Sequence, residues 1–186
     1  MQLNLMKLFD GYVRNYHTFN LTVEHGKHSF TMTEIEYFSR LGSMLGYHPF
    51  TEDTSSSTRR PMDLSWWGYY EDGYWYGLIL HLERENLYKK DEETLEKLFN
   101  EREDKPVNVI GIMNVRNRLR VEELVDIAKA KNNSGNALLI LKTNSTGRDQ
   151  LYFDEVYAYF LNMSEVVATK VAYVSDIEGT LYMHFH

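Results

Sequence analysis

Cysteine is absent from the 186 residues of the chain, which excludes disulfide bonds and zinc sites built from cysteine thiolates. No apolar run approaches the roughly 18 residues that would indicate a membrane span. Residues 1–5 lack the basic segment and the long apolar segment that begin a secretory signal. We therefore expect a cytoplasmic protein that does not cross a membrane.

Several catalytic motifs are also missing. The sequence contains no Gly-x-Ser-x-Gly motif, no phosphate-binding P-loop and no glycine-rich dinucleotide motif, so serine hydrolases of that type and nucleotide-dependent enzymes have no support. The net charge of -7 argues against a protein that coats nucleic acid without sequence preference. A nuclease remains compatible with this charge, because metal sites are themselves acidic.

What is present indicates a folded domain. Hydrophobic residues make up 43% of the chain and aromatic residues 14%, which is enough for a substantial core. The length favours a single α/β domain over residues 1–186, with a mixed central β-sheet flanked by helices. Its expected parts are an N-terminal helical part at 1–46, a sheet core at about 62–145 and C-terminal strands at about 151–186.

The N-terminal part is expected to hold two helices. Residues 4–19 show apolar side chains at helical spacing, and residues 20–30 are expected to be extended and to turn at Gly26. Residues 33–36, Thr-Glu-Ile-Glu, match a capping box. A second helix would therefore begin there and stop at Gly46.

The sheet core is expected to begin with a hairpin. Residues 64–70 and 74–82 are rich in aromatic and branched side chains, and residues 71–73, Glu-Asp-Gly, are a turn signal. The elements expected after the hairpin are a helix at 91–102, a strand at 107–112, a helix at 121–131, a strand at 137–142 and antiparallel strands after 151 that turn at 178–179. The strand–helix–strand order predicts parallel pairing through a crossover.

Three carboxylates are expected to meet at the far end of this hairpin. Glu83 and Glu85 lie two residues apart, so they point to the same face of a strand. Counting outward from the turn pairs position 63 with 81 or 82, which brings Asp63 close to Glu83. Such a cluster repels itself unless a cation or proton neutralises it, and its oxygens suit Mg²⁺. The same charges could instead be solvated residues that protect an edge strand from aggregation.

The stretch around these residues resembles the PD-(D/E)XK nuclease superfamily over about residues 31–115. That family has an Asp preceded by proline or an apolar residue, followed after a β-turn by an acid, any residue and a lysine. Pro-Met-Asp ending at Asp63 and Glu-Arg-Glu beginning at Glu83 are similar to the two halves of that pattern. The resemblance implies a restriction-endonuclease-like fold and hydrolysis of phosphodiester bonds in nucleic acid. It also implies Mg²⁺ or Mn²⁺ bound by Asp63, Glu83 and the carbonyl of Arg84.

Glu85 departs from the family pattern, because it stands where lysine is usual. Some restriction endonucleases of the superfamily look similar, with Glu-x-Glu, and Glu85 would then position the attacking water. Lys97 on the next helix is a candidate replacement for the missing lysine. Members without catalytic activity also exist. The resemblance therefore implies two hypotheses, an active nuclease or an inactive nuclease-fold module for binding or assembly.

Three other positions are candidates for supporting residues. Family members often add an acid from the helix before the sheet, which favours Glu36, with Glu34 as the alternative. Both also suit an ordinary helix start. His81 shares a strand face with the acidic cluster and could be a supporting group or a general base. Asn86, which directly follows the acidic pattern, is the third candidate.

Two further features suggest partners. Arg59 and Arg60 precede Asp63 and could hold a phosphate of a nucleic acid, although a solvated loop explains them equally well. Aromatic residues crowd the hairpin at 66–76. They suit core packing, or the interface of a homodimer or another protein partner, better than stacking on bases.

Overall fold

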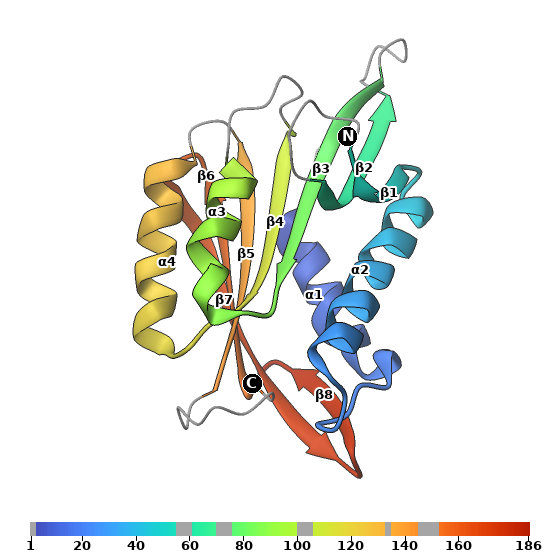
Figure 1. The fold of residues 1–186 in the computed structure, drawn as a ribbon, viewed down its shortest axis with the longest axis vertical. Coiled ribbons are helices and arrows are strands. Elements are labelled where there is room, and N and C mark those ends of the chain that lie inside the picture. The colour runs from blue at the N-terminus through green and yellow to red at the C-terminus, as the bar shows by residue number, and fades with distance from the viewer. Residues whose placement is uncertain (1–2, 55–60, 70–75, 100–105, 133–134, 145–152) are drawn as a thin grey trace.

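The computed structural model describes residues 3–54, 61–69, 76–99, 106–132, 135–144 and 153–186. These residues form one eight-stranded mixed sheet in which the strands lie side by side in chain order (Figure 1). The predicted α/β class, with a mixed central sheet flanked by helices, is therefore confirmed. Within the described ranges, no helix is long and apolar enough to cross a membrane.

The elements follow one another with few long gaps. The helices are α1 (Leu5–Asn15), α2 (Lys27–Met44), α3 (Asp91–Phe99) and α4 (Arg118–Lys131), with 3₁₀ turns η1 (Tyr16–Phe19) and η2 (Tyr88–Lys90). The strands are β1 (His48–Asp53), β2 (Met62–Tyr69), β3 (Tyr76–Glu85), β4 (Asn108–Asn114), β5 (Asn136–Thr143), β6 (Glu155–Asn162), β7 (Glu165–Ile177) and β8 (Thr180–His184).

The sheet is parallel only in its centre. β1, β2 and β3 pair antiparallel, β3, β4 and β5 pair parallel, and β5 to β8 pair antiparallel. The predicted parallel pairing of the strands around the helix at 121–131 is thus confirmed, since α4 connects β4 to β5. The predicted turn before the last strand is also confirmed, because Glu178 and Gly179 have positive φ angles of 52° and 85°.

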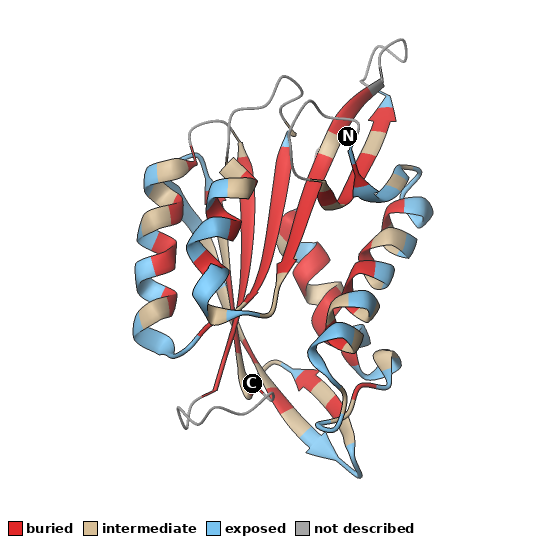
Figure 2. Ribbon diagram, viewed as in Figure 1, coloured by how far each residue is buried: buried red, intermediate tan, exposed pale blue. Residues whose placement is uncertain are grey.

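Two hydrophobic cores lie on opposite faces of the sheet. α1 and α2 cover one face, and α3 and α4 cover the other (Figure 1). β4 contributes to both by alternation, with Ile110 and Ile112 in the α1/α2 core and Val109 and Met113 in the α3/α4 core. Figure 2 shows the result: the central strands are buried along most of their length. The helices are buried only where they face the sheet.

The start of α2 differs from the sequence prediction. The helix begins at Lys27, after Gly26 as N-cap, so residues 27–30 are helical and the predicted capping box at 33–36 lies inside the helix. Its buried positions include Phe30, one turn before Glu34, so the face that packs on the sheet starts before the capping pattern. Tertiary packing therefore outweighs the local signal. The predicted stop is confirmed, since α2 ends at Met44 and Gly46 has a φ angle of 86°.

The aromatic hairpin contributes to the core, which is one of the two roles that the sequence favoured. Trp66 is completely buried. A Cβ atom at Gly42 would lie 2.6 Å from its indole Nε1, so α2 must present a glycine to approach β2 this closely. Trp66 is therefore a core residue, and the prediction that it contacts a partner protein is wrong. Tyr69 is 64% exposed and could still contact a partner, whereas residues 70–75 lie outside the described ranges.

Candidate metal centre

β2 and β3 part at the point where the acidic residues lie. Their backbone pairing ends at Leu64 and Leu82. Just beyond, the N–H of Arg84 donates a hydrogen bond of 2.8 Å to Asp63 Oδ2, and the N–H of Asp63 donates one of 3.4 Å to Glu83 Oε1. Carboxylate oxygens here accept hydrogen bonds from backbone amides of the opposite strand. The structure thus brings Asp63 and Glu83 together at the end of the hairpin.

Lys97 on α3 reaches both of these carboxylates. Its Nζ lies 2.5 Å from Glu83 Oε2 and 3.7 Å from Asp63 Oδ1. α3 begins directly after η2 and packs back along β3, so a lysine in its second turn points at the end of that strand. The residue suggested as a replacement for the family lysine is therefore in contact with both acids.

Buried polar side chains continue from this cluster across the sheet to β1. His81 is completely buried, and its Nε2 is hydrogen-bonded to Glu83 Oε1. His81 pairs across the strands with Ser65, whose hydroxyl donates to Asp53 Oδ2. The indole Nε1 of Trp67 donates to the same oxygen at 2.7 Å. His81 is thus placed to fix the orientation of Glu83, and as a buried residue it does not reach solvent directly.

The pKa of Asp63 is raised in the cluster. Burial raises the pKa of its carboxyl to about 6, with a further contribution from the negative charge of Glu83. The hydrogen bond from the Arg84 amide and the charge of Lys97 oppose this rise in pKa but do not cancel it. A carboxylate with a perturbed pKa in a cavity is a recognised sign of a functional site.

The raised pKa of Asp63 predicts a pH-dependent stability. Because the folded state keeps this proton up to about pH 6 and the unfolded chain loses it near pH 4, the stability falls as the pH rises between these two values and stays lowered above them. We expect Asp63→Asn to raise the free energy of unfolding by up to roughly 3 kcal/mol at pH 8 without divalent metal. At pH 3.5 the substitution should have little effect. Thermal unfolding followed by circular dichroism tests this, and an unchanged or lower Tm for the variant at pH 8 would contradict it.

Glu85 lines the same cavity as Asp63 and Glu83. The cavity measures about 180 Å³, and its wall is formed by Asp63, Glu83, Arg84, Glu85, Lys90, Glu93, Thr94 and Lys97. Glu85 Oε1 accepts a hydrogen bond of 2.7 Å from the N–H of Leu87, which stabilises the turn after β3. Asp63 and Glu83 therefore form the carboxylate pair, and Glu85 stands beside it.

Asp63 and Glu83 offer two neighbouring carboxylates, and carboxylate oxygens are ligands of Mg²⁺ and Mn²⁺ in proteins. Ions of this kind are often held by one or two carboxylates together with waters and substrate oxygens. Within the described ranges, no group of three or more histidine, aspartate and glutamate side chains is arranged to hold a metal. The site is thus a carboxylate pair open to a cavity, not a closed cage of protein ligands.

The other predicted residues are distributed around the site or away from it. Glu36 is exposed and forms an ion pair of 2.5 Å with Arg40 on the same helix. The alternative, Glu34, is completely buried on the opposite face of the sheet. Asn86 Nδ2 donates to the carbonyl of Lys27 at 3.0 Å and so ties the end of β3 to α2. Arg59 and Arg60 lie outside the described residues.

Sequence reasoning missed a buried polar group behind the acids. Glu34 is bonded to the Arg84 guanidinium, to Lys142 and to the hydroxyl of Tyr12. A signal existed in both elements. Glu34 stands between Phe30 and Phe38 at four-residue spacing, on the buried face of α2. Lys142 is the second-to-last residue of β5, a strand that is buried throughout.

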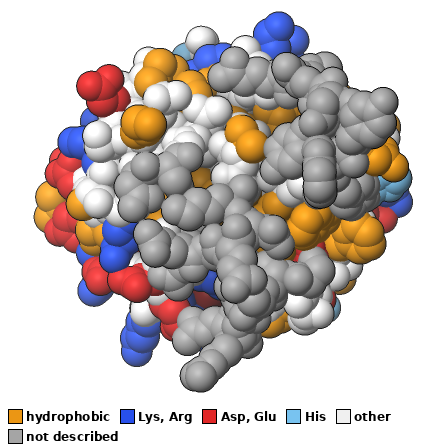
Figure 3. All heavy atoms as spheres, turned by 90° about the horizontal axis from the view of Figure 1, so that it is seen from above, with side chains coloured by type: hydrophobic (Ala, Val, Ile, Leu, Met, Phe, Trp, Pro, Cys, Tyr) orange, Lys and Arg blue, Asp and Glu red, His pale blue; other side chains and the backbone are white. Residues whose placement is uncertain are grey.

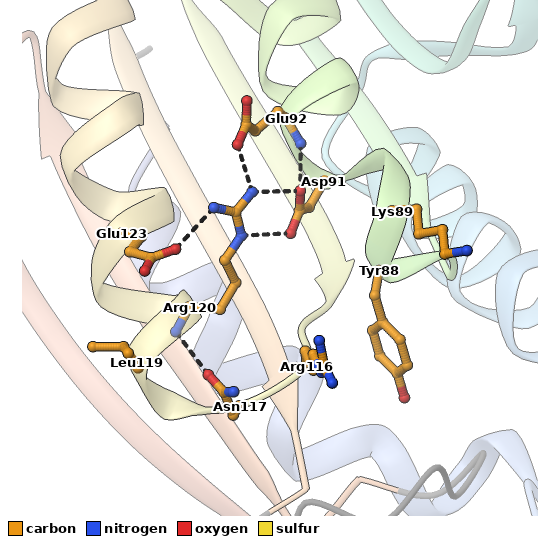
Figure 4. A pocket seen from close by; sticks show the side chains of 9 residues that line it. All are labelled: Tyr88, Lys89, Asp91, Glu92, Arg116, Asn117, Leu119, Arg120 and Glu123. Atoms are coloured by element: carbon orange, nitrogen blue, oxygen red, sulfur yellow. Dashed lines mark hydrogen bonds and ion pairs between the residues drawn. The ribbon is translucent and has the colours of Figure 1, made fainter.

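A second hollow lies between the starts of α3 and α4, at the same end of the sheet. Its volume is about 630 Å³. Arg120 lies at its centre and binds Asp91 through two contacts of 2.9 Å, Glu92 at 2.7 Å and Glu123 at 2.9 Å (Figure 4). Lys89 and Arg116 also line the hollow, and neither forms an ion pair with any described residue.

The opposite end of the molecule shows no comparable arrangement on the surface that is described. Viewed in Figure 3, the basic and acidic side chains of that end lie among one another and among scattered hydrophobic side chains. No extended patch of one charge is visible on its described part.

Comparison of the chain with protein-family models, curated proteins and solved structures finds no match, so the function has to be argued from the site itself.

Proposed function

We propose that the chain is a metal-dependent nuclease domain of the PD-(D/E)XK type, which hydrolyses phosphodiester bonds of nucleic acid. The observation that carries the proposal is the contact of Lys97 with Asp63 and Glu83 where β2 and β3 part. The element order α2, β1, β2, β3, α3, β4 supports it, because acids on a hairpin between two helices are what the resemblance implies.

The proposed division of labour follows the contacts. Asp63, Glu83 and the carbonyl of Arg84 would hold Mg²⁺ or Mn²⁺, which supplies charge stabilisation at phosphorus and a more acidic water. The Lys97 ammonium is a hydrogen-bond donor next to both acids, so it can hold the attacking water or bind a phosphoryl oxygen. We therefore assign to Lys97 the water-positioning task that the sequence pattern suggested for Glu85. His81 orients Glu83.

The direct test is metal-dependent cleavage. Purified protein should bind Mn²⁺ in calorimetry and cleave labelled single-stranded or duplex oligonucleotides, or plasmid, when Mg²⁺ or Mn²⁺ is added. A chelator should abolish cleavage. If neither metal binds to the folded protein, the proposed metal centre is refuted.

The hollow between α3 and α4 is proposed to contact the nucleic-acid backbone beside the cleavage site. Lys90 lines the acidic cavity and its neighbour Lys89 lines the hollow, so η2 separates the two. Arg120 already engages the carboxylates of the hollow, which leaves Lys89 and Arg116 available for phosphates. Half-buried Tyr88, which precedes Lys89 and Lys90 in the chain, also lines the hollow.

Replacing Lys89 and Arg116 with alanine is therefore expected to weaken oligonucleotide binding at all sequences. Each lost phosphate contact should reduce the slope of log K against log salt by about one. Fluorescence anisotropy in a chelator, where no cleavage occurs, measures this. Arg40→Ala is the matched control, because Arg40 is an exposed arginine on α2, which covers the other face of the sheet. Equal salt slopes for the double variant and the wild type would contradict the assignment.

The contact of Lys97 with Asp63 and Glu83 also supports a second function. The ammonium of Lys97 neutralises the carboxylate pair without any added ion. A chain with such a closed ion pair could be an inactive nuclease-fold module that acts through protein–protein contacts. Mn²⁺ binding without cleavage, or no binding combined with a stable self-association, would favour this alternative.

A further inference from the structure

Arg84 connects the two faces of the sheet at the acidic site. It stands between Glu83 and Glu85, so strand alternation sends its side chain to the opposite face. Its backbone N–H nevertheless binds Asp63 Oδ2 at 2.8 Å. One residue thus touches an acid of the site with its backbone and the α1/α2 core with its side chain.

The guanidinium of Arg84 is held by partners from three elements. It donates to Glu34 on α2, to the carbonyl of Glu85 at 2.6 Å and to Asn114 Oδ1 at 3.1 Å. A longer contact of 3.4 Å reaches the carbonyl of Ile112 on β4. The planar fork of arginine can satisfy several acceptors at once, which the flexible ammonium of lysine does not do in the same geometry.

Glu34, the anchor of this arginine, is itself immobilised. Its Oε1 accepts hydrogen bonds from the Tyr12 hydroxyl at 2.5 Å and from Lys142. The Lys142 Nζ lies 4.6 Å from the ring centre of Phe153 and 5.4 Å from that of Tyr12. Burial lowers the pKa of Lys142 well below its ordinary value. Glu34 is thus held from two sides, by Lys142 through Oε1 and by Arg84 through Oε2.

A buried ion pair of this kind contributes little net stability compared with a hydrophobic replacement, because both charges lose their hydration. Net stability therefore does not explain why an ion pair is buried at this position. The pair lies directly behind the strand end that carries Glu83 and Glu85, and it holds the Glu85 carbonyl in place.

We infer that Arg84 is a positioning residue for the metal centre: its guanidinium, anchored on Glu34, fixes the end of β3 so that Asp63 and Glu83 converge. The inference rests on the proposed metal centre, not on its catalytic activity. Removing such supporting contacts around metal ligands typically lowers metal affinity by 10–100-fold.

Arg84→Lys is the principal test, since it keeps the positive charge opposite Glu34 but removes the planar guanidinium and its several donors. In the folded variant, calorimetry should show Mn²⁺ affinity lowered 10–100-fold. Asn114→Ala, which removes one acceptor of the fork, should give a smaller loss in the same direction if Arg84→Lys does not fold. Lys142→Met is the matched control, because it disturbs the same buried group without touching the Glu85 carbonyl, and should change stability but not affinity.

A metal-free readout separates this inference from the proposed function. Hydrogen exchange of the Arg84 amide, which binds Asp63, should become faster in Arg84→Lys than the change in global stability explains. Absence of Mn²⁺ binding to the wild type would refute the proposed function, while amide exchange would still decide the positioning. Unchanged Mn²⁺ affinity in Arg84→Lys, or unchanged exchange at this amide, would overturn the inference.

Discussion

Replacing Lys97 with methionine is expected to slow phosphodiester cleavage by at least about a hundredfold while leaving Mn²⁺ binding intact. The loss has the size seen when one group that stabilises the transition state is removed. Both carboxylates remain in the variant. The ammonium that pairs with Glu83 at 2.5 Å is gone, so a metal no longer has to compete with it. Cleavage of a labelled oligonucleotide at saturating Mn²⁺, with calorimetry of Mn²⁺ binding, measures both effects.

The controls distinguish Lys97 from a simple ion-pair partner. Lys131→Met removes another lysine that contacts α3, through its 2.6 Å pair with Glu96, and should cleave at the wild-type rate. Asp63→Asn and Glu83→Gln should lose Mn²⁺ binding and cleavage together. Wild-type cleavage by Lys97→Met would show that this lysine serves only to balance charge, and would favour the inactive module.

The meeting of Asp63 and Glu83 could be predicted from the sequence, but its register could not. Counting from the turn placed position 63 opposite 81 or 82. In the structure the pairing shifts by one residue between Trp66 and Trp67, after which Leu64 pairs with Leu82. This bulge brings Asp63 next to Glu83. Bulges depend on packing on both faces of a sheet, so the sequence of the turn does not predict them.

The choice between Glu34 and Glu36 is a second point that the sequence could not decide. Both follow the same local pattern, and helix-start preferences treat them alike. Only the packing of α2 decides between them: Glu34 is completely buried, whereas the Glu36 side chain is 60% exposed. The site residue Lys97 was suggested by its place on the next helix. The buried contacts of the Arg84 side chain and of Lys142 were not predicted, because their partners are distant in the sequence and meet only in the folded protein.

The loss of Glu34 is expected to destabilise the fold more than any surface change. Glu34→Ala would leave the Arg84 guanidinium buried without its carboxylate, a defect that typically costs about 3–5 kcal/mol. For a chain of this size that corresponds to a fall in Tm of roughly 6–20 °C. Lys142 and the Tyr12 hydroxyl would lose their shared acceptor as well. Chemical and thermal unfolding measure the change.

Glu36→Ala on the same helix is the control, since its exposed pair with Arg40 should be worth only a few tenths of a kcal/mol. The double variant Glu34→Ala/Arg84→Met should regain much of the lost stability, because no charge is then left without a partner. Its Mn²⁺ affinity should stay low, because the Glu85 carbonyl has lost its donor. Recovery of both stability and affinity would mean that the buried pair serves the fold alone. Recovery of stability without affinity would mean that this pair is retained for the acidic site.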